Sequence, residues 1–127
     1  MIYGIGTDIL AVKRIENLMK KYGDALPRRI LSHIEQHEFD LAGARKVHFL
    51  AKRFAAKEAF SKAVGTGIRG EVSFQNISIG HNRLGRPEFL CEPALQNWLD
   101  GRGIVRIHLS LSDEADYVSA FAVAEAA

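Results

Sequence analysis

The segment from Ala51 to Gly67, AKRFAAKEAFSKAVGTG, places the tightest restriction on what this chain can fold into. Alanine, lysine, glutamate and phenylalanine fill it without a helix-breaking residue, so the pattern predicts a helix of about four turns. The sequence Gly65-Thr66-Gly67 follows, and we expect Gly65 to end the helix in the left-handed conformation. Apolar residues surround most of the circumference, which predicts that the helix lies in the centre of the fold. They are Leu50, Phe54, Ala59, Phe60, Ala63 and Val64.

One arc of this helix is different, because it combines small residues with two opposite charges. Glu58 and Lys62 are four residues apart and therefore lie one above the other on the same face, beside Ala51, Ala55 and Gly65. A glutamate–lysine pair at this spacing is most often an exposed ion pair of little energetic consequence. The small neighbours also leave room for a ligand or for another segment of backbone, so both interpretations stay open.

The first residues predict a strand from Ile2 to Ile9 with a glycine-rich face. Gly4 and Gly6 share this face with Asp8, and glycines in a strand often mark the close approach of another backbone. If the small-residue arc of the helix approaches here, Asp8 and Glu58 come together. Two carboxylates at one site need a cation or a proton between them, and a few hard oxygen ligands favour Mg²⁺ that also binds substrate phosphate. The alternative is that Asp8 caps the next helix, and the pattern favours neither.

The rest of the chain predicts a mixture of helices and antiparallel strands. Ser32 and Glu35 form a capping-box pattern at the start of one helix, and Asn82 and Gly85 are turn residues between two strands. Near the C-terminus a strand carries alternating polar residues, which form either an exposed polar face or a phosphate contact. The predicted helices span 12–22, 32–42 and 93–101, and the predicted strands span 72–80, 87–91, 104–112 and 117–125.

The composition limits the possible classes of function. With 127 residues, 47% of them hydrophobic, the chain is long enough for one domain, residues 1–127, with a core of its own. The net charge of +2 is too small to indicate nucleic-acid binding. We expect neither a signal peptide nor a membrane span, because no apolar run has the required pattern. Cys91 is the only cysteine, so no disulfide forms within the chain, which fits a cytoplasmic protein.

Basic residues are concentrated in a short segment that includes the first predicted helix. A helix face rich in lysine and arginine is either a solvated surface or a docking site for an acidic partner. The residues concerned are Lys13, Arg14, Lys20, Lys21, Arg28 and Arg29.

Four segments together resemble a known family. No GxxxxGK[ST] phosphate loop, dinucleotide fingerprint or GxSxG elbow is present. Instead, the chain contains GIGTDI at 4–9, FLAKRFAAKEAFSKAVGTGI at 49–68, LGRP at 84–87 and HLSLS at 108–112. In order and spacing they resemble the holo-acyl-carrier-protein synthases, the short bacterial type of 4′-phosphopantetheinyl transferase, over nearly the whole chain. Each segment alone is a weak signal, whereas the four together are highly specific.

The resemblance implies transfer of the 4′-phosphopantetheine arm of coenzyme A to a serine of apo-acyl carrier protein, which supports fatty acid biosynthesis and releases adenosine 3′,5′-bisphosphate. It implies that Asp8 and Glu58 hold Mg²⁺ at the pyrophosphate and that Lys62 neutralises the leaving group. Either Glu58 or a metal-bound water would serve as the base. The residues expected around coenzyme A are Arg53, Lys57, Lys62, Gly65, Thr66, Gly67, Arg86, Pro87, His108 and Ser110. Those expected to dock the carrier protein are Lys13, Arg14, Lys21 and Arg28.

The family fold is α+β, with a small antiparallel sheet packed on a long central helix. Longer relatives contain two such units and this chain has one, so the resemblance implies a homotrimer with each site between neighbouring subunits. One position departs from the pattern, because Asp113 stands where many relatives have histidine, and a nucleotide contact there would have to be supplied differently. Two other classes of function remain: a Mg²⁺-dependent nucleotide or pyrophosphate hydrolase, and a non-enzymatic module that binds an acidic partner.

Overall fold

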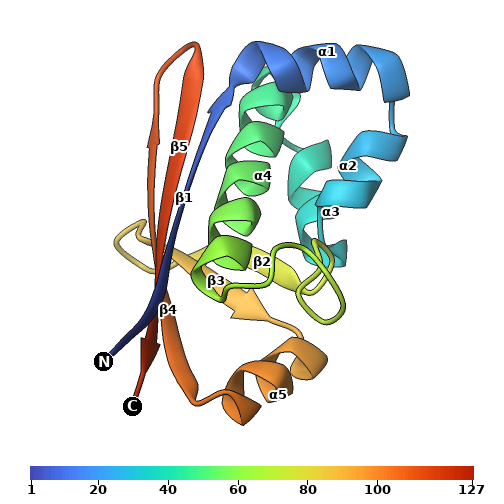
Figure 1. The fold of residues 1–127 in the computed structure, drawn as a ribbon. Helices are drawn as coiled ribbons and strands as arrows, with labels where there is room; N and C mark the ends of the chain where they lie inside the picture. Colours follow the sequence, from blue (N-terminus) through green and yellow to red (C-terminus); the bar gives the residue numbers. More distant parts are fainter.

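A long helix packed against an antiparallel sheet forms the centre of the computed structural model, which describes all 127 residues (Figure 1). This arrangement confirms the predicted α+β class and the central helix. Along the chain, the elements are β1 (Ile2–Ala11), α1 (Val12–Tyr22), α2 (Ala25–Ile30), α3 (His33–Asp40), the 3₁₀ turn η1 (Gly43–Arg45), α4 (Lys46–Ala63), β2 (Ile77–His81), β3 (Pro87–Cys91), α5 (Pro93–Gly101), β4 (Ile104–Asp113) and β5 (Tyr117–Ala126).

The main sheet has three strands in the order β1-β5-β4, and both pairings are antiparallel. Its central strand β5 places Phe121 between Thr7 of β1 and Ser110 of β4. The two chain ends meet at one end of this sheet (Figure 1), where the amino group of Met1 donates to the carbonyl of Ala126 at 2.9 Å. The strands β2 and β3 form a separate two-stranded sheet.

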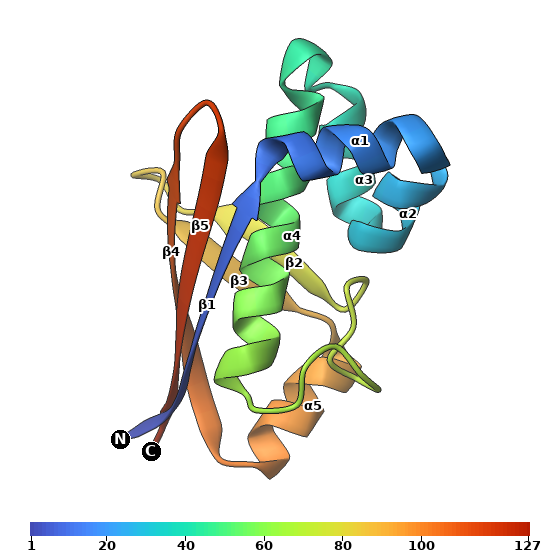
Figure 2. The same ribbon diagram turned by 45° about the horizontal axis from the view of Figure 1, so that its top comes forward.

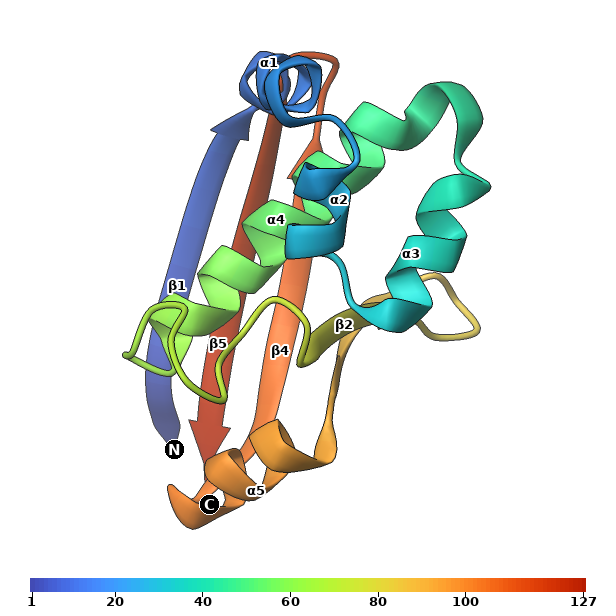
Figure 3. The same ribbon diagram turned by 90° about the vertical axis from the view of Figure 1, so that its right-hand side faces the viewer.

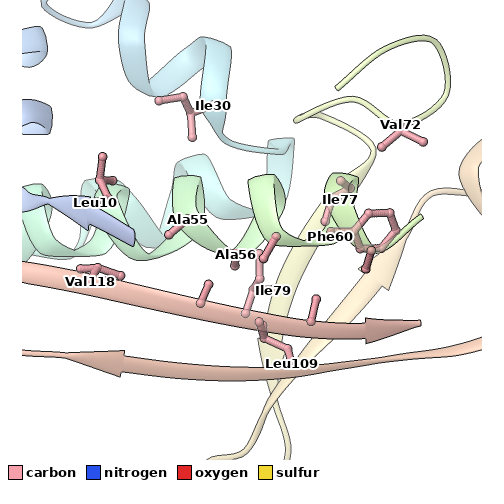
Figure 4. Packing of buried hydrophobic residues seen from close by; sticks show 14 of the residues in the cluster. Leu10, Ile30, Ala55, Ala56, Phe60, Val72, Ile77, Ile79, Leu109 and Val118 are labelled. Carbon is pink, nitrogen blue, oxygen red and sulfur yellow. The ribbon is translucent and has the colours of Figure 1, made fainter. Parts of the chain in front are cut away.

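Helix α4 lies between the main sheet and the helices α1, α2 and α3 (Figures 1 and 3). It is therefore covered on opposite sides, which explains why apolar residues surround it instead of forming one stripe. Figure 4 shows Ala55 and Ala56 of α4 between Ile30 of α2 on one side and Val118 of β5 on the other. All four of these side chains are buried in one continuous core. None of the helices combines the length and the apolar character needed to cross a membrane.

No helix covers the other face of the main sheet (Figures 1 and 2). Along β1 and β5, side chains alternate between the face that packs on α4 and this open face. The open face carries several large apolar side chains that are 42–73% exposed: Tyr3, Ile5, Ile9, Tyr117 and Phe121.

Several boundaries differ from the sequence predictions by one or two residues, and the starts of two elements differ by five. Helix α4 begins at Lys46, earlier than the predicted Ala51. The strand predicted at 72–80 begins only at Ile77, because the backbone before it turns: the side chain of Asn76 donates to the carbonyl of Glu71 at 2.9 Å, and the Ser73 hydroxyl accepts from the Asn76 N–H at 3.2 Å. The short helix α2 was not predicted.

Candidate active site

The two glycines of β1 allow α4 to approach the strand more closely than any side chain would permit. A Cβ added at Gly4 would lie 2.1 Å from the carbonyl oxygen of Ala63, and one added at Gly6 would lie 2.1 Å from that of Ala59. The predicted close approach is therefore confirmed, although it is centred on Ala59 and Ala63 and lies nearer the end of the helix than expected. It sets the distance between the side chains that follow on the two elements.

At this contact, Asp8 of β1 meets Lys62 of α4. The Lys62 ammonium donates to the backbone carbonyl of Thr7 at 2.8 Å and lies 3.3 Å from Asp8 Oδ1. The Asp8 side chain is 17% exposed and the Lys62 side chain 51%, so the pair is open to solvent on one side. Asp8 does not cap α1: the N-cap residue is Ala11, and no side chain caps that helix. The capping alternative is therefore wrong.

Glu58 lies within electrostatic range of the same pair. Partial burial raises the pKa of its carboxyl group, and the negative charge of Asp8 raises the pKa further. Lys62 and Arg14 act in the opposite direction, so Arg14 of α1 is also close enough to influence this group. The two carboxylates predicted to lie together are thus close enough for the charge of Asp8 to act on Glu58.

The oxygen atoms of Asp8 and Glu58 suit a small hard cation. No group of three or more histidine, cysteine, aspartate or glutamate side chains gathers in the structure to hold a metal. A cation here would therefore take two protein carboxylates and complete its shell with water or phosphate oxygens, which is the usual manner of Mg²⁺ binding at phosphate-transfer sites. The negative charge of Asp8 acting on Glu58 is consistent with such an ion.

The residues expected around coenzyme A fall into separate places in one chain. Arg86, Pro87 and His108 line a cavity of about 580 Å³ between β3, α5 and β4. Arg53 and Pro87 line a second cavity of about 740 Å³ beside α3 and α4, which also contains Asp113. Neither cavity is lined by Asp8, Glu58 or Lys62. The catalytic candidates and the candidate nucleotide contacts do not form a single pocket within this chain.

The glycine-flanked turn after α4 acts as its C-terminal cap. Gly65 has a φ of 87° and Gly67 a φ of 70°, a conformation that favours glycine. The N–H groups of Thr66 and Gly67 both donate to the carbonyl of Ser61, at 3.2 and 3.1 Å. The left-handed cap at Gly65 is confirmed, whereas a coenzyme A contact by Gly65, Thr66 and Gly67 stays a prediction.

Lys57 has a different role from the predicted contact with coenzyme A. Its side chain is fully buried, and its ammonium donates to Glu35 and to the carbonyls of Ile30 and Phe74 at 2.6–2.8 Å. All three of its hydrogens are therefore used inside the protein. Burial lowers the pKa of Lys57 to about 8, with Glu35 opposing the shift. The structure leaves Lys57 no access to a bound nucleotide, and we correct the expectation.

Sequence reasoning did not find the importance of Glu35. The Ser32–Glu35 capping box is present, and it fully explained a glutamate at this position. The only further signal was that lysine and arginine on α4 outnumber the acidic groups on that helix.

The polar residues of β4 lie on the open face of the main sheet. His108 Nε2 lies 2.9 Å from Glu125 Oε1 of β5, and this hydrogen bond is the main reason why the pKa of Glu125 is lowered. Ser110 is exposed on the same strand and lines neither cavity. Asp113, the one position that departs from the expected family pattern, forms an ion pair with Lys52 at 3.5 Å.

The basic residues of α1 are exposed, as predicted. Lys20 lies 3.2 Å from Glu16, whereas Lys13 is 4.0 Å from the same carboxylate. Arg14 is exposed, and its positive charge acts on the Glu58 carboxyl group. The remaining candidates Lys21 and Arg28 lie at the end of α1 and on α2.

Comparison with known proteins agrees with this arrangement. The family model of the 4′-phosphopantetheinyl transferase superfamily matches residues 4–122. The holo-[acyl-carrier-protein] synthase of Neisseria meningitidis serogroup A is 64% identical over 125 residues, which are 98% of this chain and 99% of the relative. A crystal structure of holo-[acyl-carrier-protein] synthase from Neisseria meningitidis has a TM-score of 0.95 and 63% identity, and the match covers 98% of this chain and 99% of the other.

A more distant structure includes a ligand. The holo-(acyl-carrier-protein) synthase of Bacillus anthracis, in complex with CoA (3′,5′-ADP), has a TM-score of 0.82 and 38% identity, and the match covers 100% of this chain and 99% of that one. The family model, the curated relatives and the solved structures thus give the same answer over nearly the full length. The chain belongs to the 4′-phosphopantetheinyl transferase superfamily, among its holo-[acyl-carrier-protein] synthases.

Proposed function

We propose that this chain transfers the 4′-phosphopantetheine group of coenzyme A to a serine of apo-acyl carrier protein and releases adenosine 3′,5′-bisphosphate. The observation that carries the proposal is the glycine-mediated contact of β1 and α4, which gathers Asp8, Glu58 and Lys62 in a partly open site. In the reaction, the serine oxygen forms a bond to the β-phosphorus of coenzyme A. The bond from that phosphorus to the bridging oxygen breaks, and the serine proton goes to a base.

Lys62 supplies positive charge to the leaving group in this proposal. Its ammonium contacts Thr7 and Asp8, yet half of the side chain is exposed, so it can turn toward a phosphate without leaving the site. Charge that develops on the bridging oxygen is stabilised by a cation held in place before the reaction starts. Glu58 is one candidate to accept the serine proton.

Asp8 and Glu58 would hold Mg²⁺. When bound, Mg²⁺ would neutralise negative charge on the pyrophosphate and orient the pyrophosphate oxygens. The carboxylates themselves contribute a fixed pair of oxygen ligands, because β1 and α4 cannot separate or rotate without breaking the contact at Gly6.

We further propose a homotrimer in which neighbouring subunits complete each site. The catalytic residues and the cavity that contains Arg53 lie apart within one chain, so a nucleotide bound by Arg53 needs a second subunit to supply Asp8, Glu58 and Lys62. The open face of the main sheet supports a second copy as the partner. Its large exposed apolar side chains, Ile5, Ile9 and Phe121 among them, form the kind of surface that marks a protein interface.

The carrier protein would dock on α1. Acidic proteins are attracted to its lysines and arginines, and Arg14 is near enough to Glu58 to act on its pKa. A carrier protein held by Arg14 would therefore present its serine close to the catalytic residues. We also predict a cytoplasmic location, because coenzyme A and its carrier proteins meet there.

Mass spectrometry of apo-acyl carrier protein after incubation with this chain, coenzyme A and Mg²⁺ tests the transfer directly. We expect the carrier protein to gain the mass of phosphopantetheine. Release of adenosine 3′,5′-bisphosphate from coenzyme A alone, with no carrier protein, would instead show a hydrolase. Tight carrier-protein binding without any turnover would show a non-enzymatic binding module.

Mixed assemblies test the shared site. Asp8→Asn and Arg53→Ala are each expected to reduce transfer strongly in a homogeneous trimer. If a site takes Asp8 from one subunit and Arg53 from its neighbour, co-refolding the two variants restores some sites that contain both native residues. Activity that does not recover in mixed assemblies, or a monomer in light scattering at assay concentration, would contradict the shared site.

A further inference from the structure

Three charged side chains, one from α3 and two from α4, lie in the interior of the protein. Glu35 and Lys57 are fully buried, and the Arg53 side chain is only 5% exposed. Burying charges is costly, and a well-packed apolar cluster of similar size is often at least as stable as a buried ion pair. These residues therefore call for an explanation other than stability.

The carboxylate of Glu35 is the centre of this cluster. Its Oε1 atom accepts from Lys57 at 2.6 Å and from the N–H of Ser32 at 3.1 Å. Its Oε2 atom accepts from the N–H of Ile79 at 2.9 Å and lies 3.0 Å from Arg53 Nε. The Nε–H of Arg53 makes no hydrogen bond, so the attraction between Arg53 and Glu35 is mainly Coulombic. Hydrogen bonds from α3, α4 and β2 thus hold the Glu35 carboxylate in a fixed position beside Arg53.

Arg53 is held from three directions while it lines the cavity of about 740 Å³. Glu35 lies beside its Nε, the ring of Phe49 lies 4.3 Å from its guanidinium carbon, and Glu38 Oε2 lies 3.6 Å from Nη2. A free arginine loses much rotamer freedom when it grips a ligand. Here that freedom is already lost, which reduces the cost of binding an anion.

We propose that Glu35 is a positioning residue that, together with the Phe49 ring, holds the Arg53 guanidinium ready for the anionic nucleotide end of coenzyme A. The proposal rests on the proposed function, because it takes Arg53 as a contact to that substrate. Glu35 itself is sealed in the interior and touches no ligand. Its effect is on coenzyme A affinity alone, since the catalytic residues Asp8, Glu58 and Lys62 are on another part of the surface.

A double-mutant cycle separates positioning from general damage to the fold. The variants are Glu35→Gln, Arg53→Gln and the combination of the two, with Asp40→Asn on the exposed side of α3 as the matched control. In Glu35→Gln we expect the KM for coenzyme A to rise about tenfold, the scale of one charge-assisted contact. The Kd for adenosine 3′,5′-bisphosphate, measured by calorimetry, should rise equally. The kcat and the KM for the carrier protein should stay within twofold of the native values, as should all constants of Asp40→Asn.

The combined variant decides how Glu35 acts. If Glu35 works through Arg53, the combined variant binds adenosine 3′,5′-bisphosphate no more weakly than Arg53→Gln alone. If the two losses multiply, or if kcat and both KM values deteriorate together with the folded fraction, the role is structural and the proposal is overturned. An unchanged KM for coenzyme A in Glu35→Gln overturns it as well.

Phe49→Leu tests the same arrangement without changing a buried charge, should Glu35→Gln not fold. It removes the aromatic face from Arg53 and keeps an apolar side chain, so we expect a rise of about threefold in the KM for coenzyme A, the scale of one cation–π contact. In the Arg53→Gln background the same change should have no effect, and an equal effect in both backgrounds would overturn the proposal. A native protein that transfers nothing contradicts the proposed function, whereas an active native protein with an unaltered Glu35→Gln or Phe49→Leu variant contradicts only this inference.

Discussion

Replacing Gly6 by alanine should damage both the stability and the activity of this protein. The added Cβ would lie 2.1 Å from the carbonyl oxygen of Ala59 and 2.7 Å from the backbone nitrogen of Ala63, whereas real Cβ atoms essentially never approach closer than 3.0 Å. Both clashing atoms belong to the backbone of α4, so no rotamer change relieves them. The helix and β1 must therefore separate by about 1 Å, a shift of the size that overpacked cores show.

The expected cost follows from what this separation disrupts. Overpacking a core typically costs about 1–3 kcal/mol of unfolding free energy, and the rigid carbonyl contact places Gly6→Ala at the upper end. The same shift moves Lys62 and Glu58 away from Asp8, and misplacement of catalytic groups by about 1 Å can reduce turnover by about 10²-fold. Urea unfolding and phosphopantetheine transfer measured on the same preparation give both quantities.

Gly101→Ala is the matched control for this experiment. No atom lies within 4 Å of a Cβ added at Gly101, at the end of α5. The substitution should raise the unfolding free energy by about 0.4–1 kcal/mol by restricting the unfolded chain, with unchanged turnover. If Gly6→Ala behaves like Gly101→Ala, the close approach of β1 and α4 does not position the catalytic residues, and the reasoning fails.

Three further predictions concern the charged groups of the site. Glu58→Gln should abolish transfer and yet raise the melting temperature of the metal-free protein near neutral pH. Burial and Asp8 raise the pKa of Glu58, so its ionised form opposes folding at pH 7, and this cost disappears as the pH falls below the ordinary glutamate pKa. An equal or lower melting temperature of the metal-free variant at pH 7 would contradict the electrostatic argument. Lys62→Ala should lower kcat by about 10²-fold. A rise in the KM for coenzyme A at constant kcat would instead show that Lys62 binds the substrate and the transition state equally and is not catalytic. Arg14→Glu should raise the KM for the carrier protein by about tenfold at low salt and by less at high salt. If steady-state kinetics show a raised KM for coenzyme A instead, α1 lies at the nucleotide.

The regular elements could be predicted because their signals are local. The helix at 12–22, the strand at 87–91 and the helix at 93–101 have the predicted bounds, and the capping box at Ser32 forms as expected. The strand that begins at Ile77 was predicted too long, because the preceding residues have strand-like composition while side-chain hydrogen bonds of Ser73 and Asn76 turn the backbone.

The contact between Asp8 and the end of α4 was also predictable, since glycine at two alternate strand positions has a direct steric meaning. The sequence could not distinguish the two fates of neighbouring polar residues on α4. Lys57 and Glu58 are adjacent in the chain, and the resemblance assigned Lys57 to coenzyme A and Glu58 to the metal. Which of them faces solvent depends on the direction from which α3 packs, and that is a tertiary property with no local signal.

This difference between Lys57 and Glu58 explains how one helix serves two separate purposes. Consecutive residues on a helix point about 100° apart, so α4 presents Glu58 toward β1 and Asp8 while it presents Lys57 toward α2 and α3. Lys57 is paired with Glu35 in the interior, because a buried charge without a partner is strongly unfavourable. The glycine contact fixes the distance of α4 from β1, because any larger side chain would force the two apart. This distance sets how close the Glu58 carboxylate can lie to Asp8, so the geometry of the proposed catalytic site depends on two glycines that have no side chain to touch the substrate.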